Sequence, residues 1–477
     1  MSEELLFRSA IEQAEAVRSG EVSARELVEA SVRAIERLNG DINAVVTTSA
    51  ERALEEAERV APGDDRPLAG VPILIKDLLQ ITEGIRTTFG TEASGDWIPE
   101  FDTALVRRLR GAGAIIVGKT NTPEFGILPT TEPQRFGPTR NPWEPSRTAG
   151  GSSGGTGAAV ASGMVAIGHG NDGGGSIRIP AACNGLVGLK PSRGRISFAP
   201  LVESPASLAT DGFLTRTVAD TALGLDIGAG YEWGDAAWAP PPEGTFADAA
   251  ARAPGTLRIG FTTEAPNGAE VNEDCVAAAR GAAELLESLG HRVDETAPGG
   301  PDESVISTFI VLWIAEIGAS IEGAGALWGG LDIEKIEPLS REMLEAARKM
   351  SSTEATGALA FLRGVCRAVV SWWTEHDVLI TPTLAQPPIP LGSLDPDPGA
   401  PAMQMLEKAG DFVPFTPLIN ATGQPAISLP LHQSTEGLPI GVQLIGPPAG
   451  EELLLSLSAQ IEQAAPWADR RPAMATA

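Results

Sequence analysis

The amino-acid sequence predicts an α/β fold, because short apolar runs typical of buried strands alternate with longer amphipathic segments typical of helices. The chain has 477 residues, of which 43% are hydrophobic and 20% are charged, so it is too apolar for a disordered protein and long enough to bury a large core. Its 54 glycines and 38 prolines follow no collagen-like period. A single large α/β domain accommodates this length.

The first half of the chain begins the alternation. Ser23–Glu26 is a capping box that opens a helix, and Asn39 and Gly40 are expected to end it. The other elements predicted in this half are strands at 44–46, 71–75 and 114–118 and a helix at 102–113. Between 150 and 194 glycine recurs too often for a packed helix, except in the small-residue run 158–163.

Residues 230–410 form a different zone, which opens with the proline-rich segment 239–243. It contains a helical pattern at 274–289 and the apolar run Val305–Ala315. That run, which includes Trp313, either lines a pocket or belongs to the core. The elements predicted after this zone are strands at 424–430 and 439–445, a helix at 451–462 and a loose tail at 473–477.

The charge balance excludes several classes of partner. Lys and Arg number 35 against 62 Asp and Glu, a net charge of −27, so no basic groove for nucleic acid or anionic lipid is expected. The start of the chain is acidic and amphipathic, unlike a signal peptide, and the run Val305–Ala315 is too short to span a bilayer. The three cysteines, Cys183, Cys275 and Cys366, form no disulfide framework or metal knuckle. We expect a soluble, cytoplasmic protein that binds neither membrane nor nucleic acid.

Two common motifs occur without the partners that they need. Gly168–Gly173 fits a dinucleotide-binding loop, but the acidic residue expected about 20 positions later is missing. Gly151–Gly155 fits a nucleophile elbow with Ser153 as nucleophile, which requires a histidine base, and none of the 4 histidines is suitably placed by sequence. Cys183 has no base beside it and is expected to be a small buried hydrophobe. The sequence contains no P-loop.

Three other features fit one mechanism. Lys76 ends the apolar run Val71–Ile75, and burial lowers a lysine pKa by up to roughly 3–5 units from about 10.4, which yields a usable base. Asp77 is expected on the opposite face of the strand, where it does not neutralise this effect. Ser152 lies among glycines that permit unusual backbone geometry, and Ser176 follows three glycines whose N–H groups can turn toward a developing anion.

Together Lys76, Ser152 and Ser176 resemble the Ser–cis-Ser–Lys triad of the amidase signature family. The likeness extends over nearly the whole chain and is weakest at about 230–410. The stretches that carry it outside the triad are 69–77, 118–124, 140–143, 188–191, 420–428 and 437–443. Within the family, 131–133, 140–143, 169–172 and 466–472 resemble the bacterial hydrolases of cyclic 6-aminohexanoate dimer.

The resemblance implies a single domain over 1–477 with one large mixed β-sheet sandwiched between α-helices. Its expected parts are a catalytic core at about 60–220, a variable substrate-shaping region at about 230–410, and C-terminal strands and a helix at about 411–472. It implies no metal or cofactor, a small-molecule amide substrate and a homodimer.

The resemblance also implies a mechanism. Lys76 would take a proton from Ser152, which relays it from Ser176, and Ser176 would form an acyl-enzyme with the amide carbonyl. The Ser152 peptide bond would be cis. The oxyanion hole implied with Ser176 consists of Gly173, Gly174 and Gly175, and the pocket residues implied are Gly126, Ile127 and Asn171.

The chain departs from the family pattern at two places. Cys183 lies one place earlier than usual, and Asn171 and Gly173 stand where many members carry Thr. We expect these differences to reshape the acyl side of the pocket without touching the triad. Linear amides, anilides, cyclic amides and carbamates remain open as substrates. An amidotransferase-type glutaminase subunit, an esterase with Ser153 as nucleophile and a non-catalytic binding role remain as alternatives.

Overall fold

The computed structural model describes residues 4–204, 206–299 and 303–475. The strands of these residues form one 11-stranded mixed sheet, with the order β1-β3-β2-β4-β6-β5-β10-β11-β9-β7-β8. The strands are β1 (Val45–Thr48), β2 (Pro72–Lys76), β3 (Ile115–Thr120), β4 (Ile167–Asp172), β5 (Val187–Lys190), β6 (Thr210–Thr215), β7 (Arg258–Phe261), β8 (Arg292–Glu295), β9 (Val378–Pro382), β10 (Ala426–Gln433) and β11 (Pro439–Ile445). The predicted α/β class and mixed sheet are confirmed.

Helices pack on both faces of the sheet. Ile73 and Ile75 of β2 join one buried cluster with side chains of α8, α10 and α16, whereas Leu74 joins another with side chains of α3 and α6. This alternation is what a strand buried on both faces requires. The α-helices are α1 (Glu4–Phe7), α2 (Ala10–Ser19), α3 (Ala24–Ile42), α4 (Ala50–Ala57), α5 (Ala104–Gly111), α6 (Gly154–Ala161), α7 (Arg178–Asn184), α8 (Val218–Gly228), α9 (Phe246–Ala250), α10 (Glu273–Ser288), α11 (Glu303–Leu327), α12 (Pro338–Lys349), α13 (Ser352–Val370), α14 (Gln404–Phe412), α15 (Pro417–Thr422) and α16 (Glu451–Ala464).

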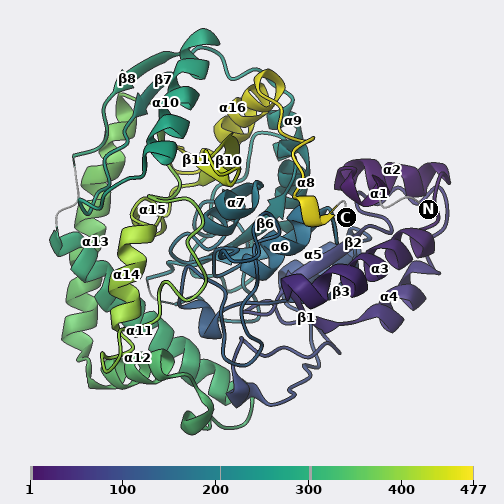
Figure 1. The fold of residues 1–477 in the computed structure, drawn as a ribbon, viewed down its shortest axis with the longest axis horizontal. Coiled ribbons are helices and arrows are strands. Elements are labelled where there is room, and N and C mark those ends of the chain that lie inside the picture. The colour runs from purple at the N-terminus through teal and green to yellow at the C-terminus, as the bar shows by residue number, and fades with distance from the viewer. Residues whose placement is uncertain (1–3, 205, 300–302, 476–477) are drawn as a thin grey trace.

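Figure 1 shows α11 to α13 gathered on the left of the molecule, and α1 to α4 on the right. The two ends of the described chain are joined by an ion pair between Arg471 and Glu4, with 2.8 Å between Nη2 and Oε1. The predicted loose tail is wrong for Ala473–Ala475, which forms a 3₁₀ turn with Ala475 buried. Residues 476–477 lie outside the described residues.

The first long helix begins as predicted but ends later. Ser23 and Glu26 form the capping box at the start of α3. The helix continues through Gly40 to Ile42 because Ile42 is fully buried in the core beneath it. Asn43, with φ 57°, is the left-handed residue that ends the helix. The predicted stop at Asn39 and Gly40 is therefore wrong by three residues or fewer, a usual error at helix ends.

The glycine-rich stretch contains packed helices, contrary to the prediction. Helices α6 and α7 are buried along their whole lengths. Glycine makes this close packing possible: a Cβ on Gly155 would lie 2.7 Å from the carbonyl oxygen of Ala44, and one on Gly157 would lie 2.7 Å from Nδ2 of Asn184. The glycines thus let α6 lie closer to its neighbours than side chains would permit.

The apolar run at 305–315 is part of a much longer helix. Ser304–Leu327 of α11 is long and apolar enough to cross a membrane, and 33% of its most apolar window is buried. The prediction that this run is too short to span a bilayer is therefore wrong, because the pattern extends well beyond Ala315. Core helices of soluble proteins meet the same test, and α11 packs along α12 and α13.

A buried ion pair shapes the turn that follows β4. The Arg178 guanidinium contacts the Asp172 carboxylate, with 2.9 Å between Nη2 and Oδ1, and both side chains are fully buried. The same carboxylate accepts hydrogen bonds from the backbone N–H of Gly175 (2.7 Å) and Ile177 (3.1 Å). Burial by itself would raise the pKa of Asp172, but the charge and hydrogen bonds of Arg178 outweigh it and hold the pKa well below its usual range.

We predict that Arg178→Met lowers the free energy of unfolding by about 3–5 kcal/mol, because it leaves a buried carboxylate without its counter-charge. Urea denaturation followed by tryptophan fluorescence measures this change. The matched control is Arg348→Met, which removes a guanidinium from an exposed pair with Glu322 and should change stability little. Equal losses in the two variants would contradict this role of the buried pair.

Candidate active site

Lys76 is the last residue of β2, and its side chain is fully buried. Its Nζ lies 2.7 Å from the Ser152 Oγ and 2.6 Å from the Asn171 Oδ1. Burial lowers the pKa of Lys76 well below its usual value, although the charges of Asp172 and Asp211 oppose the shift. An uncharged amine at this position can accept the Ser152 proton across the same contact.

Asp77 does not neutralise this amine, as predicted. Its carboxylate accepts hydrogen bonds from the backbone N–H of Thr88 at 3.0 Å and from the Thr88 hydroxyl. Its charge acts instead on Lys119, whose pKa burial lowers to about 8 against the opposing charge of Asp77. Two neighbouring buried lysines therefore have separate surroundings.

Asn171 touches the predicted triad directly, contrary to the sequence-based expectation. Its Oδ1 accepts from Lys76, and its Nδ2 donates to the Leu78 carbonyl at 3.1 Å. The contact arises because β2 and β4 are adjacent parallel strands, so Lys76 and Asn171 come to the same edge of the sheet. A neutral amide satisfies a donor of Lys76 without adding the negative charge that would raise its pKa.

The two adjacent serines have different surroundings. The peptide bond between Gly151 and Ser152 is cis, and the Ser152 hydroxyl meets Lys76. The Ser153 hydroxyl is fully buried and donates to the carbonyl of Asn171 at 3.2 Å. Among the described residues no histidine contacts Ser153, since the His169 ring is held by Asp211 at 3.0 Å. The nucleophile-elbow interpretation thus lacks the base that it requires.

Ser176 opens into a cavity of about 520 Å³ that Ser152 and Asn171 also line. The backbone N–H of Ser153 donates to the Ser176 carbonyl at 3.2 Å, which ties the two serine segments together. Within the described ranges no hydrogen bond joins the Ser152 and Ser176 hydroxyls. The structure therefore brings Lys76 into contact with Ser152 and places Ser176 on the wall of the same cavity.

The glycine turn offers fewer anion donors than predicted. The N–H of Gly175 already donates to Asp172, so it is not free to bind an oxyanion, and that expectation is corrected. Gly173 lines the 520 Å³ cavity, and Gly174 lines a second cavity of about 140 Å³. The carbonyl of Gly174 accepts from the Thr416 hydroxyl at 2.6 Å, which fixes the turn from the far side.

The remaining predicted site residues also lie at these cavities. Gly126, with φ +71°, lines the larger one, and a Cβ there would lie 3.1 Å from the Ser152 Oγ. Ile127 lines the smaller one. Cys183 is fully buried, and burial raises the pKa of its thiol, as expected of an inert hydrophobe. Within the described ranges no group of three or more His, Cys, Asp or Glu side chains is placed to hold a metal ion.

The site combines a buried amine, a serine hydroxyl hydrogen-bonded to it, and a cavity that a second serine lines. This arrangement suits a hydrolase that uses serine as nucleophile. The sequence model of the amidase family matches residues 26–455. The chain therefore belongs to the amidase family.

Individual relatives agree with this assignment. The chain is 40% identical to the 6-aminohexanoate-cyclic-dimer hydrolase of Pseudomonas sp. (strain NK87), over 99% of this chain and 98% of that protein. It resembles the solved structure of 6-aminohexanoate cyclic dimer hydrolase complexed with substrate, with a TM-score of 0.91 and 39% identity over 98% of this chain and 99% of that one. It also resembles a bacterial aryl acylamidase of the amidase signature family, with a TM-score of 0.85 and 28% identity over 97% of both chains.

We predict that the Lys76 amine titrates well below a free lysine, because burial disfavours its charged form. The measurement is the pH dependence of lysine side-chain chemical shifts in isotopically labelled protein. Lys76→Met identifies the signal by its disappearance. A Lys76 signal that titrates at the ordinary lysine pKa would contradict the burial argument.

Proposed function

We propose that this protein hydrolyses amide C–N bonds through Lys76, Ser152 and Ser176, with an acyl-enzyme on Ser176. The observation that carries the proposal is the buried contact between Lys76 and Ser152 at a cavity that Ser176 also lines. Membership of the amidase family, with relatives named as a cyclic-amide hydrolase and an aryl acylamidase, supports the same reaction.

The first half of the reaction forms the ester. Uncharged Lys76 accepts the Ser152 proton, and Ser152 accepts the proton of Ser176 as the Ser176 oxygen attacks the carbonyl carbon. The backbone N–H groups of Gly173, Gly174 and Ser176 are the candidate donors to the oxyanion, and loss of one such donor typically costs about 10²–10³ in rate. The C–N bond then breaks, and the nitrogen leaves as an amine with the proton returned through Ser152.

The second half releases the acid. A water molecule attacks the ester carbonyl and gives a proton to Ser152, which passes its own proton to Lys76 as in the first half. The ester C–O bond breaks, Ser176 recovers its proton, and a carboxylic acid leaves. Lys76 must be uncharged at the start of each half, which its burial favours.

The substrate we propose is a small-molecule amide. Cyclic amides of the 6-aminohexanoate type are the first candidates, because relatives of this chain are named as hydrolases of that cyclic dimer. Linear amides follow them. Aryl amides and carbamates come next, the former because a solved relative is an aryl acylamidase. The cytoplasmic location and the homodimer stay predictions.

We predict that Ser176→Ala abolishes amide hydrolysis, because no acyl-enzyme can form. Ser153→Ala should retain turnover, since Ser153 is buried and bonded to a backbone carbonyl. The appearance of new amino groups from a panel of a linear amide, an anilide, a lactam and a carbamate measures both, with the isolated chain and no partner subunit. A fluorophosphonate probe followed by peptide mapping should label Ser176; label on Ser153 would overturn the assignment.

We predict that turnover falls as the pH falls through the lowered pKa of Lys76, because the protonated amine cannot act as a base. Asn171→Asp places a carboxylate against Lys76, which raises its pKa and moves this acidic limb to higher pH. The matched control is Asn272→Asp, an exposed helix cap that tolerates the change. If the acidic limb of the pH profile is at the same pH in Asn171→Asp as in the unmodified protein, the role of Lys76 is contradicted.

A further inference from the structure

Two cavities meet at Ser176. The 520 Å³ cavity, here the relay chamber, is the one that Ser152 and Asn171 line. The 140 Å³ cavity, here the apolar chamber, lies between α11, α14 and α15. Among the residues that the structure describes, only Ser176 and Trp313 line both chambers. A substrate bound at Ser176 therefore has two separate spaces available to it.

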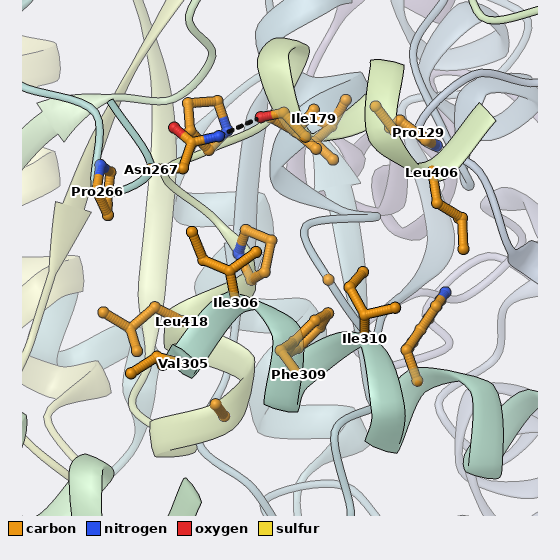
Figure 2. Close-up of a pocket in the computed structure, with 18 of the residues that line it drawn as sticks. Pro129, Ile179, Pro266, Asn267, Val305, Ile306, Phe309, Ile310, Leu406 and Leu418 are labelled. Atoms are coloured by element: carbon orange, nitrogen blue, oxygen red, sulfur yellow. Dashed lines mark hydrogen bonds between the residues drawn. The ribbon is translucent and has the colours of Figure 1, made fainter. Parts of the chain in front are cut away.

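The apolar chamber is lined almost wholly by hydrocarbon. Apart from Ser176 and the indole of Trp313, its one polar side chain among the described residues is that of Asn267, which donates to the Gly410 carbonyl at 3.0 Å. No charged side chain lines it within the described ranges. Figure 2 shows Ile306 and Ile310 pointing into this space from α11, across from Ile179.

The relay chamber differs in chemistry. Most of its lining is also apolar, but besides Ser152 and Asn171 it includes the polar side chains of Glu203, Ser204, Ser207 and Glu316. The Ser204 hydroxyl donates a hydrogen bond to the Glu316 carboxylate, and burial raises the pKa of Glu316. On one side of Ser176 the chain thus offers a largely apolar space that also carries hydroxyl and carboxyl groups, and on the other side a space lined almost wholly by hydrocarbon.

An aromatic pair lies next to the glycine turn, where Trp313 lines both chambers and Phe309 lines the apolar chamber. Phe309 and Trp313, one helical turn apart on α11, are stacked with ring centroids 6.1 Å apart. A Cβ on Gly173 would lie 2.9 Å from Cζ3 of Trp313, and one on Gly174 would lie 3.8 Å from Cζ of Phe309. The turn that precedes Ser176 therefore passes close to this aromatic pair, and Gly173 lines the relay chamber whereas Gly174 lines the apolar chamber.

The proposed reaction assigns the two halves of the substrate to these spaces. The leaving nitrogen must receive its proton from Ser152, which lines the relay chamber and not the apolar chamber. The amine half therefore occupies the relay chamber. The carbonyl carbon stays bonded to Ser176, so its other substituent must extend into the remaining space that Ser176 faces, which is the apolar chamber.

We propose that the acyl group of the substrate occupies the apolar chamber, so that this enzyme prefers amides with an uncharged aliphatic or aryl acyl group. This inference rests on the proposed function. A charged end on the acyl chain would be buried without a counter-charge, which is strongly unfavourable. Each added methylene should instead raise kcat/KM about fourfold until the chamber is full.

Three p-nitroanilides test the assignment with the amine half held constant: acetyl, hexanoyl and 6-aminohexanoyl. We expect kcat/KM for hexanoyl to exceed that for 6-aminohexanoyl, which has the same six carbons and a terminal ammonium, by more than about tenfold. Equal rates for these two substrates would overturn the assignment. Turnover that persists in Ser176→Ala would overturn the proposed function instead, and a panel with no turnover at all would count against both.

Two substitutions in α11 test the role of each chamber separately. Ile310→Trp fills part of the apolar chamber and should collapse the hexanoyl-to-acetyl ratio of kcat/KM by about tenfold or more. Ala319→Trp adds the same side chain to the relay chamber at an exposed position and should leave that ratio within about threefold. Because each readout is a ratio within one protein, partial misfolding does not alter it. The reverse pattern would place the acyl group in the relay chamber.

Discussion

The buried ion pair between Asp172 and Arg178 holds the turn that carries Ser176 in its conformation. A carboxylate removed from water needs hydrogen-bond donors, and here the guanidinium and the N–H groups of Gly175 and Ile177 supply them. The turn that carries Ser176 has to wrap around that carboxylate. Arg178 also reaches the Asn420 side chain of α15 and the Gln443 side chain of β11, so the same pair ties the turn to the C-terminal part of the sheet.

Three buried lysines differ in the groups that surround their amines. Lys119 faces Asp77, and Lys190, whose pKa burial lowers to about 7, donates to the Pro191 carbonyl at 2.8 Å. Only Lys76 of these three meets a serine hydroxyl beside a cavity. A lowered pKa by itself therefore does not mark the base; the neighbouring hydroxyl and the space for a substrate do.

Helix α11 combines an apolar composition with two structural roles. Its residues pack against α12 and α13 on some sides and line both chambers on another. A helix with apolar neighbours in several directions is hydrophobic around most of its circumference. This helix, which lies in the region where the sequence resembles the family least, thus lines both chambers.

The sequence alone determined what depends on local spacing: the buried strand that ends in Lys76, the glycine-flanked Ser152 and Ser176, and the α/β alternation. Tertiary structure decided what depends on contacts between distant segments. The bond from Lys76 to Asn171 requires β2 and β4 to be neighbours, and Gly175 loses its N–H to a carboxylate held by Arg178. Both chambers form where α11 meets segments that are distant in the sequence, the glycine turn among them. Such pairings carry no local signal, because hydrogen bonds and cavities are set by three-dimensional proximity rather than by position along the chain.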